Sequence, residues 1–305
     1  MPKTRQSTKK RKTERKPVTQ IISSKPMMQA VVLGTRAQGQ TIGLVPTMGA
    51  LHEGHIALIR EARLQADLVI VSLFVNPKQF NSRSDLKRYP SDLSSDLKIC
   101  ESLGVDVIFA PDAETMYPPG FGTTVSGGDL GKRLEGKSRP GHFDGVLTIV
   151  SKLFTLTFPH FAVFGEKDFQ QLSLIKQMVR DLHFPVEIVA MPVIREIDGL
   201  AYSSRNAHLG KKQRKQATCL FHAIQAVQDK VSLGETRRRA LLNAGRRELR
   251  SADLFTLDYM DIVEPRTLTP VQEVKQTARL LLAGNFSGRR SVRLIDNGPL
   301  FPSGR

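Results

Sequence analysis

The chain has 305 residues, of which 40% are hydrophobic, and a formal net charge of +16. This length allows one large or two modest domains with buried cores. No apolar run approaches the roughly 18 residues that span a bilayer, and the N-terminus lacks the apolar core of a secretory signal. Two cysteines, Cys100 and Cys219, lie far apart and fit no metal or redox pattern, which favours thiols in a reducing cytoplasm.

The positive charge is partly concentrated at the N-terminus. Eight Lys and Arg residues against one Glu give residues 1–17 a net charge of +7, which leaves +9 for the remainder. The segment is polar and lacks apolar periodicity, so we expect a disordered basic tail. Three roles stay open for it: a solvated tail, an arm for nucleic acid or a membrane surface, and an organelle address, although no amphipathic stripe is present.

From residue 18 to residue 191 the chain alternates strand-like and helix-like runs. Strands are predicted at 42–46, 68–75, 105–110, 160–165 and 186–191, and helices at 54–66, 91–103, 144–157 and 167–182. This alternation predicts an α/β fold, in which a Rossmann-like parallel sheet is covered on both faces. Ligands bind beyond the carboxyl ends of the strands in such sheets.

The sequence pattern changes after about residue 191. A helical stretch rich in Arg, Lys and Gln runs from 211 to 250, and shorter strand-like runs follow at 255–263, 278–283 and 291–296. We therefore predict a smaller α+β C-terminal domain over residues 192–305, which would act as a lid on the first domain.

His52-Glu53-Gly54-His55 lies between a strand-like run and an amphipathic helix. Two imidazoles at such a turn can converge on a phosphate, and the helix N-terminus adds free N–H groups. Gly54 and the preceding Pro46-Thr47-Met48-Gly49 would let a nucleotide approach the backbone closely. A zinc site and ordinary surface histidines are the alternatives, but the spacing is not that of a zinc helix and no nearby acid completes a metal site.

Three further polar segments follow predicted strands. Asn76 and Gln79 carry amides that can hold a carboxylate or a hydroxyl. Lys167 suits phosphate charge at a helix start, and Asp168 either caps that helix or contacts a ribose. Ser203-Ser204-Arg205 can fork around phosphoryl oxygens. Each segment alone also fits an ordinary turn, helix start or loop.

Taken together and in order, these segments resemble the pantothenate synthetase (pantoate–β-alanine ligase) family of the HxGH nucleotidylyl-transferase superfamily. The resemblance runs from about residue 20 to about residue 298. It rests on Pro46–His55, Phe74–Phe80, Tyr89-Pro90, Arg139–Phe143, Phe164–Gln171, Asp198–Ala201, Ser203–Asn206 and Arg293–Asn297.

The resemblance implies an ATP-dependent ligase of pantothenate and coenzyme A biosynthesis. Pantoate and Mg-ATP would give pantoyl adenylate and pyrophosphate, and β-alanine would then give pantothenate and AMP. It also implies a cytoplasmic homodimer, with Mg²⁺ that arrives with ATP and has no dedicated protein ligands. A related ligase and a nucleic-acid-binding protein are the competing hypotheses. The latter is disfavoured because no nucleic-acid module and no stacking platform is recognisable.

The resemblance also assigns residues. The catalytic set is His55 as proton donor, His52, Lys167 and Arg205. ATP binding is assigned to Met48, His52, His55, Gly165, Glu166, Lys167, Asp168, Ile194, Tyr202, Ser203, Ser204 and Arg205. Pantoate binding is assigned to Gln79, Gln171, Asn76, Arg139 and His142, and β-alanine binding to Gln79. Two features depart from the family pattern: Tyr202 stands at a usually aliphatic position, and the basic tail has no counterpart.

Overall fold

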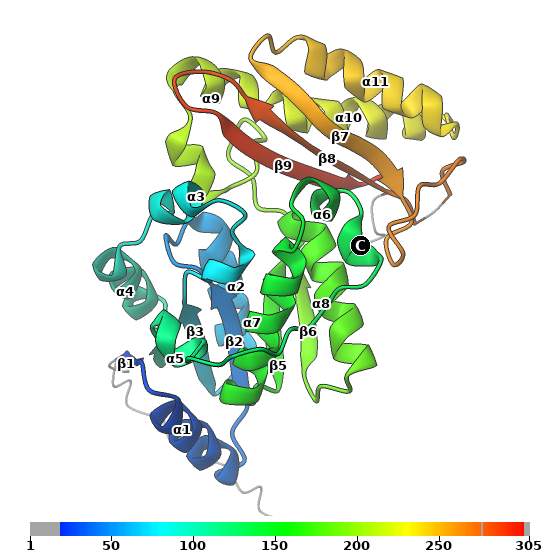
Figure 1. The fold of residues 1–305 in the computed structure, drawn as a ribbon. Helices are drawn as coiled ribbons and strands as arrows, with labels where there is room; N and C mark the ends of the chain where they lie inside the picture. Colours follow the sequence, from blue (N-terminus) through cyan, green and yellow to red (C-terminus); the bar gives the residue numbers. More distant parts are fainter. Residues whose placement is uncertain (1–18, 276, 302–305) are drawn as a thin grey trace, which may run out of the picture.

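The computed structural model describes residues 19–301 with the exception of residue 276. The predicted basic tail over residues 1–17 lies outside the described residues. The described chain forms a parallel sheet in the order β1-β4-β3-β2-β5-β6 and an antiparallel sheet in the order β7-β8-β9 (Figure 1). The predicted fold class is therefore confirmed.

The four central strands of the parallel sheet are mostly apolar runs because both of their faces are buried. Ile42 and Leu44 contribute to the core on one face, whereas Val45 and Val71 contribute to the core on the other. All five predicted strands are present, and a short edge strand, β1, was not predicted. Their bounds are β1 (Gln20–Ile22), β2 (Ile42–Thr47), β3 (Leu68–Leu73), β4 (Val107–Phe109), β5 (Phe161–Gly165) and β6 (Glu187–Met191).

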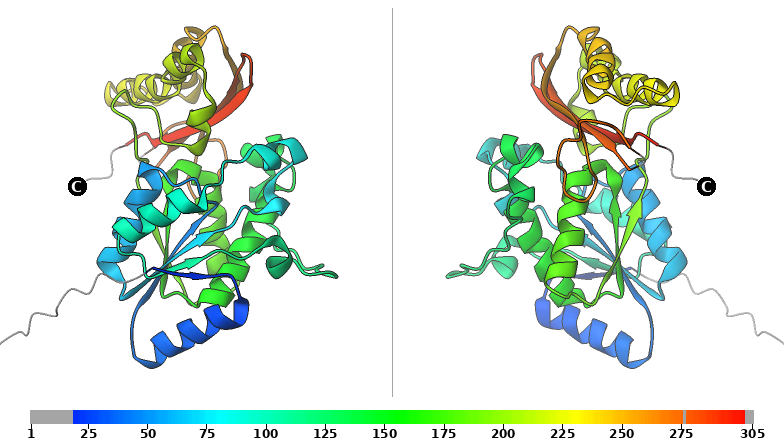
Figure 2. Two further views of the ribbon diagram at one scale, coloured as in Figure 1. Left: turned by 90° about the vertical axis from the view of Figure 1, so that its left-hand side faces the viewer. Right: turned by 90° about the vertical axis from the view of Figure 1, so that its right-hand side faces the viewer.

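Helices cover both faces of this sheet (Figure 2). One face packs against α1 (Lys25–Ala37), α7 (His142–Thr157) and α8 (Phe169–Asp181), and the other packs against α2 (Glu53–Gln65) and α4 (Leu93–Ser102). Helix α1 was not predicted. The connecting segments hold α3 (Arg83–Arg88), α5 (Ala113–Met116), α6 (Glu135–Ser138) and the short 3₁₀ turns η1 (Pro77–Gln79), η2 (Leu130–Lys132), η3 (Glu166–Asp168) and η4 (Ser204–His208).

The C-terminal part, called the small domain below, comprises residues 192–301. Where one helical stretch was predicted over 211–250, the structure has three helices, and Gly234, at a φ of 88°, follows the end of the second. The elements are α9 (Lys211–Ala217), α10 (Cys219–Ser232), α11 (Arg238–Arg250), β7 (Phe255–Val263), β8 (Arg279–Phe286) and β9 (Val292–Pro299).

The antiparallel sheet of the small domain uses both of its faces. Ile262 and Leu280 pack with the helices α9–α11, whereas Leu281 packs with Leu134 and Phe169 of the larger part. The small domain thus sits on the larger part through this second face, with α6 and α8 beneath it (Figure 1). None of the helices in the described part of the chain is long and apolar enough to cross a membrane.

The order of the parallel strands defines a crevice at their carboxyl ends. Strands β2 and β5 are neighbours, but the chain leaves β2 through α2 toward β3 and leaves β5 through α8 toward β6, on the opposite side. Ligands bind at such switch points in open α/β sheets. The histidine turn follows β2 and Lys167 follows β5, so the topology brings both to this crevice.

Candidate active site

A cavity lies at the carboxyl edge of the parallel sheet. Its free space is about 1420 Å³, including solvent at the mouth, and its walls come from both the larger part and the small domain. Glu166 is the only residue assigned from the sequence that does not line it. The assigned residues that do are Met48, His52, His55, Asn76, Gln79, Arg139, His142, Gly165, Lys167, Asp168, Gln171, Ile194, Tyr202, Ser203, Ser204 and Arg205.

The loop between β2 and the histidines is held by a side chain that the sequence did not reveal. Asp96 of α4 is 3% exposed, and its carboxylate accepts hydrogen bonds from the N–H groups of Ala50 at 3.0 Å and Leu51 at 2.8 Å. Ala50 has a φ of 51° and Gly49 a φ of 81°. A Cβ at position 49 would come within 2.9 Å of the Asp96 carboxylate, so this loop requires glycine.

The two histidines form the N-terminus of α2. His52 is the N-cap, and its Nδ1 accepts a hydrogen bond from the Gly54 N–H at 3.1 Å, while His55 Nδ1 accepts from the His52 N–H at 3.4 Å. Because each Nδ1 is an acceptor, a neutral ring carries its proton on Nε2. A Cβ on Gly54 would lie 2.9 Å from the His52 ring. Gly54 therefore makes room for that ring, which differs from the close nucleotide approach predicted from the sequence.

Burial keeps both rings neutral. It lowers the pKa of His55 to about 3, with a further lowering by His52, and it lowers the pKa of His52 to about 4, with a further lowering by Lys167. At neutral pH the chain therefore presents two uncharged N–H donors here. This geometry therefore leaves the Nε2–H group of His55 available as a hydrogen-bond donor, whereas the role of proton donor assigned to His55 stays a prediction.

In the turn η1, which follows β3, the Gln79 side chain is held by its neighbours. Its Nε2 contacts the Met48 sulfur at 3.0 Å and its Oε1 accepts a hydrogen bond from Asn76 Nδ2 at 3.0 Å. Asn76 also donates to the Gly145 carbonyl and accepts from the Tyr117 hydroxyl and the Lys78 N–H. The amide of Asn76 is thus fully used within the chain, which makes it a support for Gln79.

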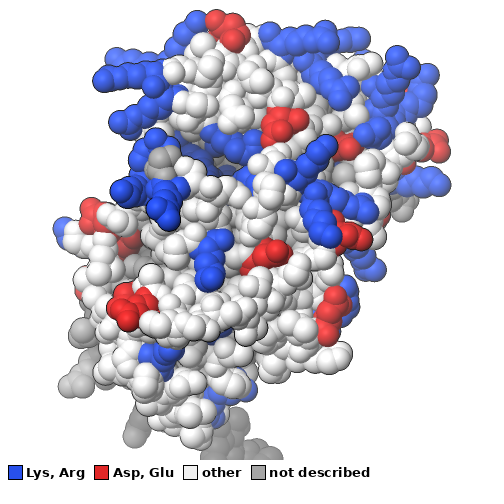
Figure 3. All heavy atoms as spheres, viewed as in Figure 1, with Lys and Arg blue, Asp and Glu red and all other residues white. Residues whose placement is uncertain are grey.

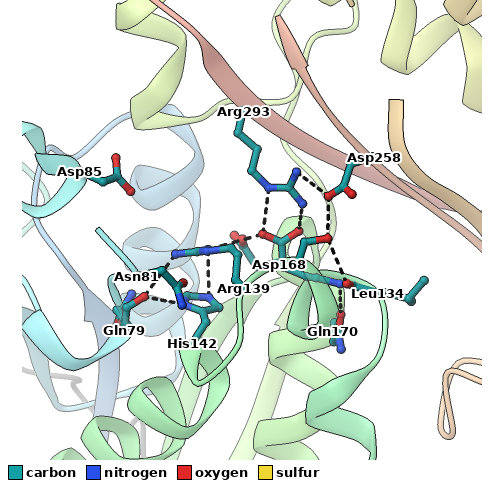
Figure 4. A network of polar contacts seen from close by, with 12 residues as sticks. Gln79, Asn81, Asp85, Leu134, Arg139, His142, Asp168, Gln170, Asp258 and Arg293 are labelled. Atoms are coloured by element: carbon teal, nitrogen blue, oxygen red, sulfur yellow. Dashed lines mark hydrogen bonds and ion pairs between the residues drawn. The ribbon is translucent and has the colours of Figure 1, made fainter. Parts of the chain in front are cut away.

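Arg139 and His142 lie behind Gln79 (Figure 4). The His142 Nδ1 lies 2.8 Å from the Gln79 carbonyl, which can only accept, so this nitrogen carries the proton, and Nε2 accepts from Arg139 at 3.1 Å. Burial, followed by the charge of Arg139, lowers the pKa of His142 to about 4. Both nitrogens of this neutral ring therefore have partners in the chain.

A buried carboxylate connects this cluster to the small domain. Glu135 of α6 is 6% exposed and pairs with Arg139 at 3.5 Å and with Arg293 of β9 at 2.6 Å. Arg293 also pairs with Asp258 of β7 at 2.8 Å, and Tyr259 donates its hydroxyl to Glu135 at 3.4 Å. The two guanidinium groups compensate the buried charge. Neither Glu135 nor its pairing with Arg139 and Arg293 was predicted from the sequence.

Lys167 and Asp168 close the other side of the cavity, in the 3₁₀ turn η3. The Lys167 ammonium lies 3.7 Å from the Asp168 carboxylate. Asp168 precedes α8 but makes no side-chain hydrogen bond to it, so the helix-cap interpretation is wrong and the side chain faces the cavity. Glu166 points away from the cavity and pairs with Arg279 of β8 at 2.6 Å. This geometry therefore does not favour direct ATP binding by the Glu166 side chain.

The segment 202–205 forms the wall contributed by the small domain. Ser203 caps η4 by accepting from the Arg205 N–H at 3.3 Å, and the Arg205 guanidinium lies 3.8 Å from the Asp85 carboxylate. The Ser204 hydroxyl contacts the Tyr89 hydroxyl at 3.5 Å. Tyr202, the departure from the family pattern, stacks on His52 with ring centroids 6.1 Å apart. The Tyr202 ring thus packs against a histidine that is proposed to bind phosphate.

The surface of the small domain is strongly basic. Lys and Arg gather over the small domain in Figure 3, whereas much of the face below it is uncharged. Several of these arginines are exposed on α11, among them Arg239, Arg247 and Arg250. A positive field near a cleft raises the local concentration of anions. Arg139, Lys167 and Arg205 line the cavity itself, and this positive charge favours an anionic ligand.

The comparisons with known proteins agree with this geometry. The model of the pantoate-beta-alanine ligase family matches residues 20–299. Pantothenate synthetase of Trichlorobacter lovleyi is 49% identical over 270 residues, which cover 88% of this chain and 94% of the relative. Pantothenate synthetase of Aquifex aeolicus is 48% identical over 263 residues, or 86% and 92% of the two chains.

Solved structures lead to the same family. The crystal structure of the Thermus thermophilus pantothenate synthetase superposes with a TM-score of 0.88 at 44% identity and covers 93% of this chain and 100% of that one. The pantoate-beta-alanine ligase of Francisella tularensis, complexed with beta-gamma ATP and beta-alanine, has a TM-score of 0.75 at 36% identity, with coverage of 94% and 99%. The chain is a member of the pantoate–β-alanine ligase family.

Proposed function

We propose that this cavity activates pantoate with ATP and then joins it to β-alanine. In the first step a pantoate carboxylate oxygen attacks the α-phosphorus, the bond from that phosphorus to the β-phosphate bridge breaks, and pyrophosphate leaves. In the second step the β-alanine amine attacks the acyl carbon, the bond to AMP breaks, and the nitrogen loses a proton. The Francisella tularensis relative complexed with beta-gamma ATP and beta-alanine supports this choice of substrates.

The observation that carries the proposal is that one cavity contains both hydrogen-bond donors suited to phosphate and amides suited to a carboxylate. His52 and His55 present Nε2–H groups from α2, and Lys167 adds a charge from the neighbouring strand β5. Ser203, Ser204 and Arg205 face them from the small domain. Fixed donors of this kind stabilise charge that develops on phosphoryl oxygens, which is the main requirement of such a transfer. Met48, Gly165, Asp168, Ile194 and Tyr202 would enclose the nucleotide.

The carboxylate end is assigned to two glutamines. Gln79 and Gln171 line the cavity, and neutral amides can hold pantoate without a competing charge. Gln79 would also meet β-alanine. Asn76, Arg139 and His142 hold Gln79 through its side chain and its carbonyl, so we place them behind it.

Mg²⁺ fits the cavity as a companion of ATP. Within residues 19–301 apart from residue 276, no group of three or more His, Cys, Asp or Glu side chains is arranged to hold a metal ion. The donors around the cavity are imidazoles, an ammonium group, guanidinium groups, hydroxyls and amides, which suit phosphate oxygens. Mg²⁺ bound to the triphosphate would neutralise part of its charge. We also propose that the protein acts as a homodimer in the cytoplasm, on the basis of the family resemblance.

The decisive experiment separates the two steps. The purified chain is incubated with ATP, Mg²⁺ and pantoate but without β-alanine, and pyrophosphate is measured in a single turnover. We expect about one pyrophosphate per active site, followed by AMP release when β-alanine is added. Short hydroxy acids and acetate serve as control acids for the rival ligase hypothesis. Equal pyrophosphate from all acids would reject pantoate as the substrate, and none with pantoate would reject the adenylate mechanism.

A further inference from the structure

The Arg293–Asn297 segment of β9 matches the family, but the proposed chemistry does not use it. Its last residue reaches out of the small domain: Asn297 Nδ2 donates to the Glu166 carbonyl at 2.9 Å and to the Lys167 carbonyl at 2.8 Å. Both carbonyls belong to η3, the turn that presents Lys167 to the cavity. Asn297 therefore binds the backbone of the phosphate-binding turn directly.

Asn297 is itself rigidly held. Its side chain is 2% exposed, and its Oδ1 accepts a hydrogen bond from Arg279 Nε at 2.7 Å. The Arg279 guanidinium pairs with Glu166 at 2.6 Å and lies 4.0 Å from the centroid of the Phe169 ring. The amide is thus fixed by a second buried side chain, so its two donors have little freedom to move.

The turn η3 has little support of its own. Gly165 before η3 has no side chain with which to cap it, and the Asp168 side chain at its end makes no cap hydrogen bond. Such caps would accept hydrogen bonds from N–H groups only and would not bind the carbonyls of the turn. The two hydrogen bonds from Asn297 supply partners for carbonyls of this turn, and they come from a strand that is 130 residues away along the chain from Lys167.

We propose that Asn297 is a positioning residue for Lys167, through which the small domain fixes the phosphate-binding turn. Arg279 keeps the Asn297 amide in the orientation that this task requires. This inference rests on the proposed function only in taking Lys167 as a phosphate ligand. It predicts that loss of the two Asn297 donors weakens ATP binding and adenylation while pantoate binding stays nearly unchanged.

The test uses two variants and a matched control in the full chain. Asn297→Asp keeps the side-chain size and the acceptor for Arg279 but removes both donors, and Asn297→Ala removes the whole amide. The control is Gln213→Ala in α9. Gln213 is also a buried amide, 5% exposed, and it donates to the carbonyls of Phe286 and Arg290 inside the small domain.

Three kinds of measurement are made for each variant: the melting temperature, the Kd of ATP by calorimetry, and the steady-state constants kcat and KM for pyrophosphate release. We expect both Asn297 variants to raise the Kd and KM of ATP about tenfold or more and to lower kcat, with the KM of pantoate within about twofold of the parent. Gln213→Ala should lower the melting temperature without changing the ATP constants. Wild-type ATP constants in folded Asn297→Asp, or the same loss in Gln213→Ala, would overturn the proposal.

Calorimetry keeps this test independent of the proposed reaction. If the parent chain binds ATP but releases no pyrophosphate, the ligase mechanism fails. The Kd of ATP in the Asn297 variants then still decides between a positioning role, where affinity falls, and a purely structural role, where it does not.

Discussion

The carboxylate of Asp96 accepts a hydrogen bond from the backbone N–H of Leu51 at 2.8 Å, next to the first histidine of the cavity. A second bond, from Ala50, holds that residue at a φ of 51°. A side chain 46 positions away along the chain thus sets the path of the loop that delivers His52.

Asp96→Asn should expose this dependence. An amide can accept only one of the two N–H groups and sets its own NH₂ against the other, so we expect a loss of about 2 kcal/mol in unfolding free energy. We also expect adenylation to slow by about tenfold to a hundredfold because the histidines move. The matched control is Asp92→Asn at the exposed N-cap of the same helix. An equal rate in the parent and in Asp96→Asn would contradict the prediction.

His55→Ala should lower the adenylation rate by several hundredfold, an effect typical of losing a fixed donor to the transition state. His55→Gln, which keeps a donor, should recover part of this loss. Single-turnover pyrophosphate release measures both variants, and their melting temperatures control for folding. A rate for His55→Ala within about threefold of the parent would remove His55 from the catalytic set.

Gln79→Ala should mainly impair the use of pantoate and β-alanine. Its side-chain contacts are with Met48 and Asn76 and not with Lys167 or Arg205, which are proposed to bind phosphate. We expect the KM of pantoate to rise at least about tenfold, whereas the Kd of ATP should change by less than about threefold. Initial-rate kinetics and ATP calorimetry separate the two effects. A selective loss of ATP affinity would instead place Gln79 at the nucleotide.

Acid should begin to destabilise the fold at pH values well above the pKa of most carboxylates. The pKa of His52, His55 and His142 is lowered by burial to about 4, about 3 and about 4. Unfolded histidines titrate near 6.5, so below that pH the unfolded chain binds more protons than the fold and the unfolding free energy falls.

Between pH 7.5 and pH 5.5 we expect a loss of about 1 kcal/mol for each of these three histidines. Urea unfolding at both pH values measures it, and His55→Gln should show a smaller loss than the parent. A parent chain whose unfolding free energy is the same at both pH values would show that these rings are not held neutral by the fold.

The parallel sheet was predictable because buried strands are continuous apolar runs. The segment 68–73 is an example, and its polar continuation marks the carboxyl end where ligands bind. Helix α1 was missed because its buried stripe is narrow: Met28 and Val32 are buried, but Leu33 is 62% exposed. Such a mixture blurs the helical period in the sequence.

The cavity was predictable where a motif carries its own chemistry, as in His52–His55. The residues that hold these motifs in place were not predictable. Asp96, Glu135 and Asn297 act through partners that lie far away along the chain, and only the strand order brings them together. No local pattern announces such a contact. The Arg293–Asn297 match was visible in the sequence, but its purpose depends on where β9 meets η3.

Glu135 has a consequence for how this protein can change over time. Its single carboxylate pairs with Arg139 on one side and with Arg293 on the other. Loss of the carboxylate alone would leave Arg139 without its acidic partner and Arg293 with Asp258 alone, in a buried place. Replacement of either arginine alone would leave part of the carboxylate unpaired. Substitutions at these three positions should therefore occur together during evolution. A relative without the glutamate is expected to lack one of the arginines as well.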